Sequence, residues 1–202
     1  MGRTPLVWAA RNGHEEVVRI LLGRDDIDPS KPDIIGRTAL CWAAANGHEG
    51  VVELLLGRGD VDPDKPNMYG QTPLSEAVRE GQERIVKLLL GRDDVNPNKP
   101  DRFGATPLWW AADNGHEGVV KLLLGRSDVD PDRPNMYGQT PLWAAANYSH
   151  EGVVKLLLEH DNINPEIPDH EGRTPFSCAA ENGHAEVMAL LQPPTSAIHN
   201  TT

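Results

Sequence analysis

A Thr-Pro-Leu motif recurs along this chain with a fixed spacing of 34 residues. The proline and the leucine are each replaced once, by Ala39 and by Phe176, and the spacing never slips. The copies begin at Thr4, Thr38, Thr72, Thr106, Thr140 and Thr174. A period of this length indicates one repeated structural unit, and such units bury a core only by stacking on their neighbours. The sequence therefore predicts a repeat solenoid.

The first copy indicates how one unit folds. Thr4 is a suitable helix N-cap and proline suits the first helical turn, so a short helix is predicted from Pro5 to about Gly13. A second helix follows, with its valines and leucines on one stripe, and ends at Gly23. Residues 24–37 contain two prolines and a glycine, which exclude helix and favour an extended finger with a turn.

The pattern T-P-L-x-W-A-A-x-N-G-H-E-x-V-V-x-L-L-L resembles the ankyrin repeat. The resemblance implies an all-α repeat solenoid with β-hairpin fingers, an ankyrin repeat stack, that holds partners on its concave face. The 34-residue variant also resembles repeats in fungal ankyrin arrays, including the tails of NACHT-type NTPases. Six repeats are predicted, at about 2–35, 36–69, 70–103, 104–137, 138–171 and 172–192, and residues 193–202 are expected to be a disordered tail.

Composition narrows the classes of partner. Nineteen Lys and Arg against thirty Asp and Glu give a net charge of −11, which argues against binding to nucleic acid or to anionic membranes. No segment has the length and hydropathy of a membrane span, and the N-terminus does not resemble a signal peptide. Cys41 and Cys178 are expected to be free thiols. We therefore expect a soluble, cytoplasmic protein.

Few residues suggest catalysis or metal binding. The histidines that follow the Asn-Gly turn recur at a fixed offset, and the resemblance implies that they bind loop backbone; Gln82 replaces one of them. The Asp-rich fingers lack the glycine and glutamate of an EF-hand loop. We predict no catalytic residue, no metal and no cofactor. The exception left open is a titratable group around the last finger, His160, Asp161, His170 and Glu171.

Two surfaces vary between copies while the framework stays constant. One is the exposed side of the first helix of each repeat, and the other is the finger tip, where large apolar groups recur. Variation on a fixed scaffold is typical of a recognition surface, and aromatic residues are frequent anchors of interfaces. The residues predicted to contact a partner are Ile34, Ile35, Arg37, Trp42, Met68, Tyr69, Gln71, Arg102, Phe103, Trp109, Trp110, Asp113, Met136, Tyr137, Gln139, Trp143 and Tyr148.

The leading hypothesis is a non-catalytic scaffold that binds a protein or peptide. Three alternatives stay open: a ligand-sensing tail of a larger NACHT-type signalling protein, a small-molecule or catalytic groove near the last finger, and a consensus-like array without a natural partner. The first repeat presents an uncovered apolar stacking surface, so end-to-end self-association is also expected.

Overall fold

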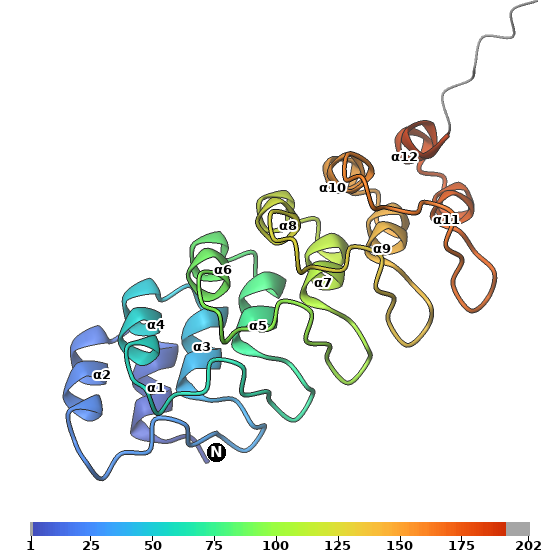
Figure 1. Cartoon of the computed structure of the whole chain (residues 1–202). Helices are drawn as coiled ribbons and strands as arrows, with labels where there is room; N and C mark the ends of the chain where they lie inside the picture. Colours follow the sequence, from blue (N-terminus) through green and yellow to red (C-terminus); the bar gives the residue numbers. More distant parts are fainter. Residues whose placement is uncertain (1, 193–202) are drawn as a thin grey trace, which may run out of the picture.

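The computed structural model describes residues 2–192, which form a single row of helix pairs (Figure 1). The first helices of the pairs, here called the inner helices, are α1 (Pro5–Arg11), α3 (Ala39–Ala45), α5 (Pro73–Arg79), α7 (Pro107–Asp113), α9 (Pro141–Asn147) and α11 (Pro175–Glu181). The outer helices are α2 (Glu15–Leu22), α4 (Glu49–Leu56), α6 (Glu83–Leu90), α8 (Glu117–Leu124), α10 (Glu151–Leu158) and α12 (Ala185–Leu191). The predicted all-α solenoid is confirmed. The predicted tail at 193–202 lies outside the described residues.

The repeated threonine sets the start of every inner helix. Thr4 Oγ1 accepts a hydrogen bond from Val7 N at 3.1 Å, and the same bond forms at the start of each of the other inner helices. This bond satisfies one of the backbone donors that a helix leaves unpaired at its N-terminus. The turn between inner and outer helix has positive φ, as at Gly13 with 71°, and only Ser149, with φ of 60°, replaces glycine there.

The core runs continuously along the row between the two layers of helices. Each inner helix packs against the next inner helix and each outer helix against the next outer one. Alanines such as Ala43 and Ala44 are fully buried and allow inner helices to approach closely, while Val52 and Leu55 of α4 fill the space between the layers. Because each repeat buries its apolar side only against its neighbours, stability is distributed over the junctions.

Two ladders of polar contacts connect successive repeats. Nε2 of His48 lies 2.9 Å from the carbonyl oxygen of Arg11, and the later histidines make the same contact one repeat further on. The structural role predicted for these histidines is confirmed. On the outer side, Arg58 donates to the carbonyl oxygen of Leu22 and forms a bidentate pair with Asp60, an arrangement repeated twice along the row.

The fingers extend to the side of the inner helices (Figure 1), but the expected β-hairpins are absent from residues 2–192, which contain no β-strand. In the first finger Pro29 and Pro32 have no backbone N–H and cannot contribute donors to a ladder. Only the tip closes, where Asp33 N donates to the carbonyl oxygen of Arg37 at 2.9 Å and Gly36 has φ of 82°. The fingers are therefore extended loops with a tight turn at the tip.

Candidate partner-binding face

An Asp or Asn at the start of each tip fixes its conformation. Asp33 Oδ1 accepts hydrogen bonds from the backbone N–H groups of Ile35 and Arg37, both at 3.0 Å. The equivalent bonds are made by Asn67, Asp101, Asn135 and Asp169. All five of these side chains are buried. The prediction from sequence omitted them, although an Asp or Asn three residues before the tip glycine is a readable turn signal.

Backbone hydrogen bonds also join each tip to the next one. Met68 N donates to the carbonyl oxygen of Ile35 at 3.0 Å, and Arg102 N donates to that of Tyr69 at 2.9 Å. The same bond links Met136 N to Phe103 and His170 N to Tyr137, at 2.8 and 2.9 Å. Side-chain bonds also join successive fingers, since Lys65 Nζ donates to the carbonyl oxygen of Ser30 at 2.9 Å and Asn96 N donates to Asp64 Oδ2 at 3.0 Å. The tips therefore form one ordered edge along the row.

The side chains of this edge are largely apolar and exposed to solvent. Ile34 is 72% exposed, Met68 58%, Tyr137 53% and Phe103 44%. Met136 and Tyr69 are also exposed, and the guanidinium of Arg102 lies between two rings of the edge, 5.4 Å from that of Tyr69 and 5.5 Å from that of Phe103. Arg102 therefore bridges the tip that carries Tyr69 and the next tip along the row. We call the exposed side chains Ile34, Met68, Tyr69, Phe103, Met136 and Tyr137 the tip row.

Three tryptophans predicted as partner contacts lie in the interior instead. Trp42 and Trp109 are 9% exposed and Trp143 is 6% exposed. Trp109 packs edge-to-face on the partly buried Trp110, with ring centroids 5.1 Å apart, and it packs against Ala144 of the next repeat. The small Ala144 replaces a large residue found at this position in earlier repeats, so the indole fills the space it leaves. These tryptophans pack beneath the surface of the inner helices and expose little area to a partner.

Three of the five tips are tied to the inner helix that follows them through the side chain nine residues later. Trp42 Nε1 donates to Asp33 Oδ2 at 3.0 Å, and Trp110 Nε1 donates to Asp101 Oδ2 at 3.1 Å. In the third repeat the direction of the bond is reversed, since Asn67 is the donor and Glu76 Oε1 the acceptor, at 3.0 Å. In each of these three pairs, one of the two residues supplies the donor and the other the acceptor.

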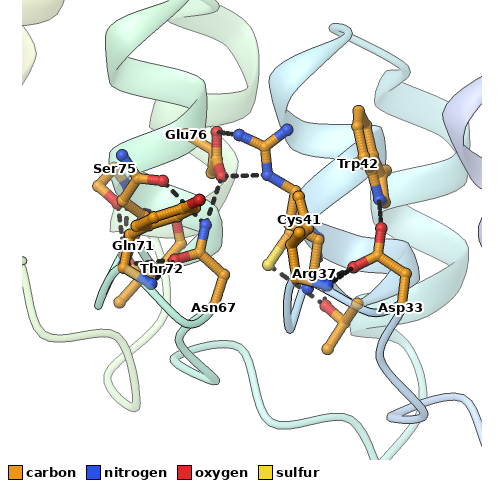
Figure 2. A network of polar contacts seen from close by, with 12 residues as sticks. Asp33, Arg37, Cys41, Trp42, Asn67, Gln71, Thr72, Ser75 and Glu76 are labelled. Atoms are coloured by element: carbon orange, nitrogen blue, oxygen red, sulfur yellow. Dashed lines mark hydrogen bonds and ion pairs between the residues drawn. The ribbon is translucent and has the colours of Figure 1, made fainter.

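The residue Glu76 is the centre of a buried polar network shown in Figure 2. Its Oε1 lies 2.7 Å from Arg37 Nε, and its Oε2 accepts from Arg37 Nη2 at 3.0 Å. The exposed fraction of Glu76 is only 2%. Burial raises the pKa of its carboxyl, and the positive charges of Arg37 and Arg79 offset this only in part. Gln71 is also buried and belongs to the same network, since its Oε1 accepts from Asn67 Nδ2 at 2.8 Å.

Guanidinium groups surround the indole of Trp42. The Cζ atoms of Arg3 and Arg11 both lie 4.7 Å from the ring centroid, and that of Arg37 lies 4.6 Å away. Arg3 also lies over Trp8, which is 45% exposed. A guanidinium within about 6 Å of an indole centroid is attracted by the ring quadrupole. The inner face of the first two repeats is therefore basic and aromatic, although the whole chain is acidic.

The remaining predicted contacts fall on the later inner helices and tips. Arg79 lies over the ring of Trp110, with Cζ 4.3 Å from the centroid. Asp113 is partly buried, and this burial raises its pKa. Tyr148, at the end of α9, is 56% exposed, and Gln139 is half-buried and accepts from Asn135 Nδ2 at 2.9 Å. The inner face thus changes from basic in the first two repeats to mixed in the middle and later ones.

The titratable group around the last finger does not form a compact site. His160 lines a shallow depression against α8 and α10 with Lys121 and Glu159, whereas His170 lies on the finger tip. Within residues 2–192 no group of three or more His, Cys, Asp or Glu side chains is placed to hold a metal ion. Both cysteines are free, as expected, and both are buried; burial raises the pKa of Cys41 to about 11. That thiol is therefore protonated at neutral pH and is a poor nucleophile.

Comparisons with known proteins agree with the fold. A family model described as ankyrin repeats (3 copies) matches residues 1–67, 26–101, 59–135 and 108–201. Among solved structures, the crystal structure of EF0377, an ankyrin repeat protein, is similar with a TM-score of 0.84 and 29% sequence identity. The match covers 92% of this chain and 95% of that one. A search of curated protein sequences found no significant match.

The match of the family model extends over nearly the whole chain and includes every helix pair. None of the helices in the described range 2–192 is long and apolar enough to cross a membrane. Proteins built from such repeats generally act as protein-binding scaffolds. This chain belongs to the ankyrin repeat family.

Proposed function

We propose that this chain is a non-catalytic module that binds a protein or peptide across the tip row and the adjoining inner face. The observation that carries the proposal is the exposure of the tip row on an edge that is held in register. Six large apolar side chains, between 37% and 72% exposed, are presented by turns that backbone hydrogen bonds fix to one another. A pre-ordered surface loses little conformational entropy on binding, which favours affinity.

The burial of other predicted residues narrows the proposed contact set. Trp42, Trp109, Trp143 and Gln71 are at most 9% exposed, so they position the face rather than touch a partner. The proposed contacts are the tip row together with Arg102, Trp110, Asp113, Gln139 and Tyr148, and with Ile35 and Arg37, which are half-buried. The same face would serve a free-standing module or the recognition tail of a larger NACHT-type signalling protein.

Selection of peptides from a displayed random library on the intact chain tests this proposal. The decisive variant is Met136→Ser with Tyr137→Ser, because both side chains are 53% exposed and their removal leaves the backbone bonds of the tip in place. Arg84→Ser on α6 is the matched control, since its side chain is 85% exposed on the outer side. We expect the selected peptides to bind the tip variant at least about tenfold more weakly, and the control within about twofold. Equal loss in both variants, or no loss in either, would contradict the proposal.

A further inference from the structure

The basic and aromatic part of the inner face defines the chemistry of the partner more closely. Three guanidiniums lie within 4.7 Å of the centroid of the Trp42 ring. Arg37 is neutralised by the buried Glu76, through contacts of 2.7 and 3.0 Å. Like charges gathered around one ring repel one another unless anions accompany them. Arg3 and Arg11 are the two guanidiniums of this group that Glu76 does not neutralise.

Arg3 and Arg11 are less completely paired. Within residues 2–192 no carboxylate lies within ion-pairing distance of Arg11, and the contact of Arg3 with Asp33 is long, at 3.7 Å. The carboxylate of Asp33 already accepts from Ile35 N, Arg37 N and Trp42 Nε1. Its capacity to bind further donors is thus largely used. Both guanidiniums retain donors in a planar arrangement that matches a carboxylate.

A depression of about 330 Å³ adjoins Arg3. Arg11 does not line it, but its guanidinium, like that of Arg3, lies near the rings of both Trp8 and Trp42. It is lined by Arg3, Trp8, Asp33, Ile34 and Ile35, so it has an indole and two aliphatic side chains beside one cation and one carboxylate, and that carboxylate already accepts three hydrogen bonds. Ile34 belongs to the tip row, and the depression therefore connects the basic part of the inner face with the proposed binding edge. An apolar side chain of a partner would fit between Trp8 and Ile34, and a neighbouring carboxylate of the same partner would lie against Arg3 and Arg11.

We propose that the first two repeats bind an acidic linear segment of the partner, in which an Asp or Glu pairs with Arg3 and Arg11 and an adjacent bulky apolar side chain enters the depression. This inference rests on the proposed binding function and specifies one end of its site. The net charge of −11 opposes an acidic partner at long range. Screening over about 8 Å at physiological ionic strength weakens that opposition, whereas the two guanidiniums act in direct contact.

Peptides of defined chemistry test the inference on the intact chain. Three fluorescein-labelled probes share a central Leu and differ only in the flanking residues, which are Glu, Gln or Lys. A fourth probe has phosphoserine in place of Glu and separates carboxylate from phosphate. Affinity is measured by fluorescence anisotropy, and location by the shifts of the indole N–H resonances of Trp8 and Trp42, with the interior Trp143 as reference. We expect the Glu probe to bind at least about tenfold more tightly than the Gln and Lys probes and to shift Trp8 and Trp42.

The variant Arg11→Gln should weaken binding of the Glu probe about tenfold while leaving the Gln probe unchanged. Arg19→Gln on α2, whose side chain is 60% exposed, is the matched control and should change neither affinity by more than about twofold. Circular dichroism establishes that both variants are folded. Equal affinity for the Glu and Gln probes, absence of binding by the Glu probe, or preference for phosphoserine alone would each overturn the inference. If the displayed peptides still depend on the tip row in that case, the proposed function stands without it.

Discussion

The donor and acceptor pairing between tip and helix gives a quantitative prediction for Asn67→Asp. In the native chain Asn67 Nδ2 donates to Glu76 Oε1 at 3.0 Å and to Gln71 Oε1 at 2.8 Å. The substitution replaces that donor with a carboxylate oxygen beside a carboxylate that is 2% exposed. Two charges about 3 Å apart repel by about 5 kcal/mol at an effective dielectric constant of about 20.

Protonation limits this cost, because one carboxyl of the pair can take up a proton. A carboxyl with an ordinary pKa of about 4.3 is kept protonated near pH 7 at a cost of about 3.7 kcal/mol. Near pH 5 the cost falls to about 1 kcal/mol. We therefore expect Asn67→Asp to lower the free energy of unfolding by about 3 kcal/mol near pH 7 and by about 1 kcal/mol near pH 5. The sign follows from proton binding: the folded-state pKa is raised above the unfolded value, so the folded state binds more protons. Stability is consequently lost as pH rises from the unfolded pKa through the folded one.

Urea unfolding followed by circular dichroism at both pH values measures these differences. The double variant Asn67→Asp with Glu76→Gln is the matched partner, because the amide introduced on the helix can donate to the carboxylate introduced at the tip, as Trp42 donates to Asp33. We expect the double variant to recover about 2 kcal/mol near pH 7 relative to Asn67→Asp alone. A cost for the single variant below about 0.5 kcal/mol, or one that does not change between the two pH values, would refute the reasoning.

Three further predictions concern the framework. Ser149→Gly should raise the free energy of unfolding by about 1 kcal/mol in urea titrations, since Ser149 has φ of 60° where the other repeats have glycine; an unchanged value would exclude strain at this turn. The double variant His160→Arg with Asn162→Asp would restore the bidentate pair that Arg126 and Asp128 form one repeat earlier. It should raise the free energy of unfolding by less than about 1 kcal/mol, and a decrease would contradict this prediction. The chain should self-associate through the first repeat, because Val17 is 47% exposed whereas its counterpart Val51 is fully buried; a monomer mass that stays constant in light scattering across concentrations would reject this.

The architecture could be read from the sequence because its determinants are local. The threonine caps, the turn glycines and the valine and leucine stripes each specify a short helix or its end, and the fixed period specifies stacking. The period showed that the histidines recur at a fixed offset, and the family resemblance supplied their role. The expectation of strands in the fingers was wrong because it came from the family resemblance, whereas prolines such as Pro29 and Pro32 in this chain remove ladder donors.

The candidate face was predictable only in part, since exposure depends on contacts between repeats. Trp42 and Trp8 occupy equivalent positions, yet Trp42 is 9% exposed and Trp8 45%. The difference arises because a preceding repeat covers Trp42 and places arginines on its ring. The tip row was predicted correctly as exposed because turn residues have few neighbours in any repeat. The pairing of Asn67 with Glu76 joins a loop to a helix and has no local signature.

The most direct test of the central claim is a map of backbone amide shifts on the isotope-labelled chain as a selected peptide is added. We expect the perturbed amides to cluster at the tips, from Ile34 to Tyr137, and on the exposed side of the inner helices. The amides of the outer helices, such as those of α4 and α6, should remain unchanged. Perturbations confined to the outer helices, with the tip amides unaffected at saturation, would contradict the claim that the tip row and inner face form the binding surface.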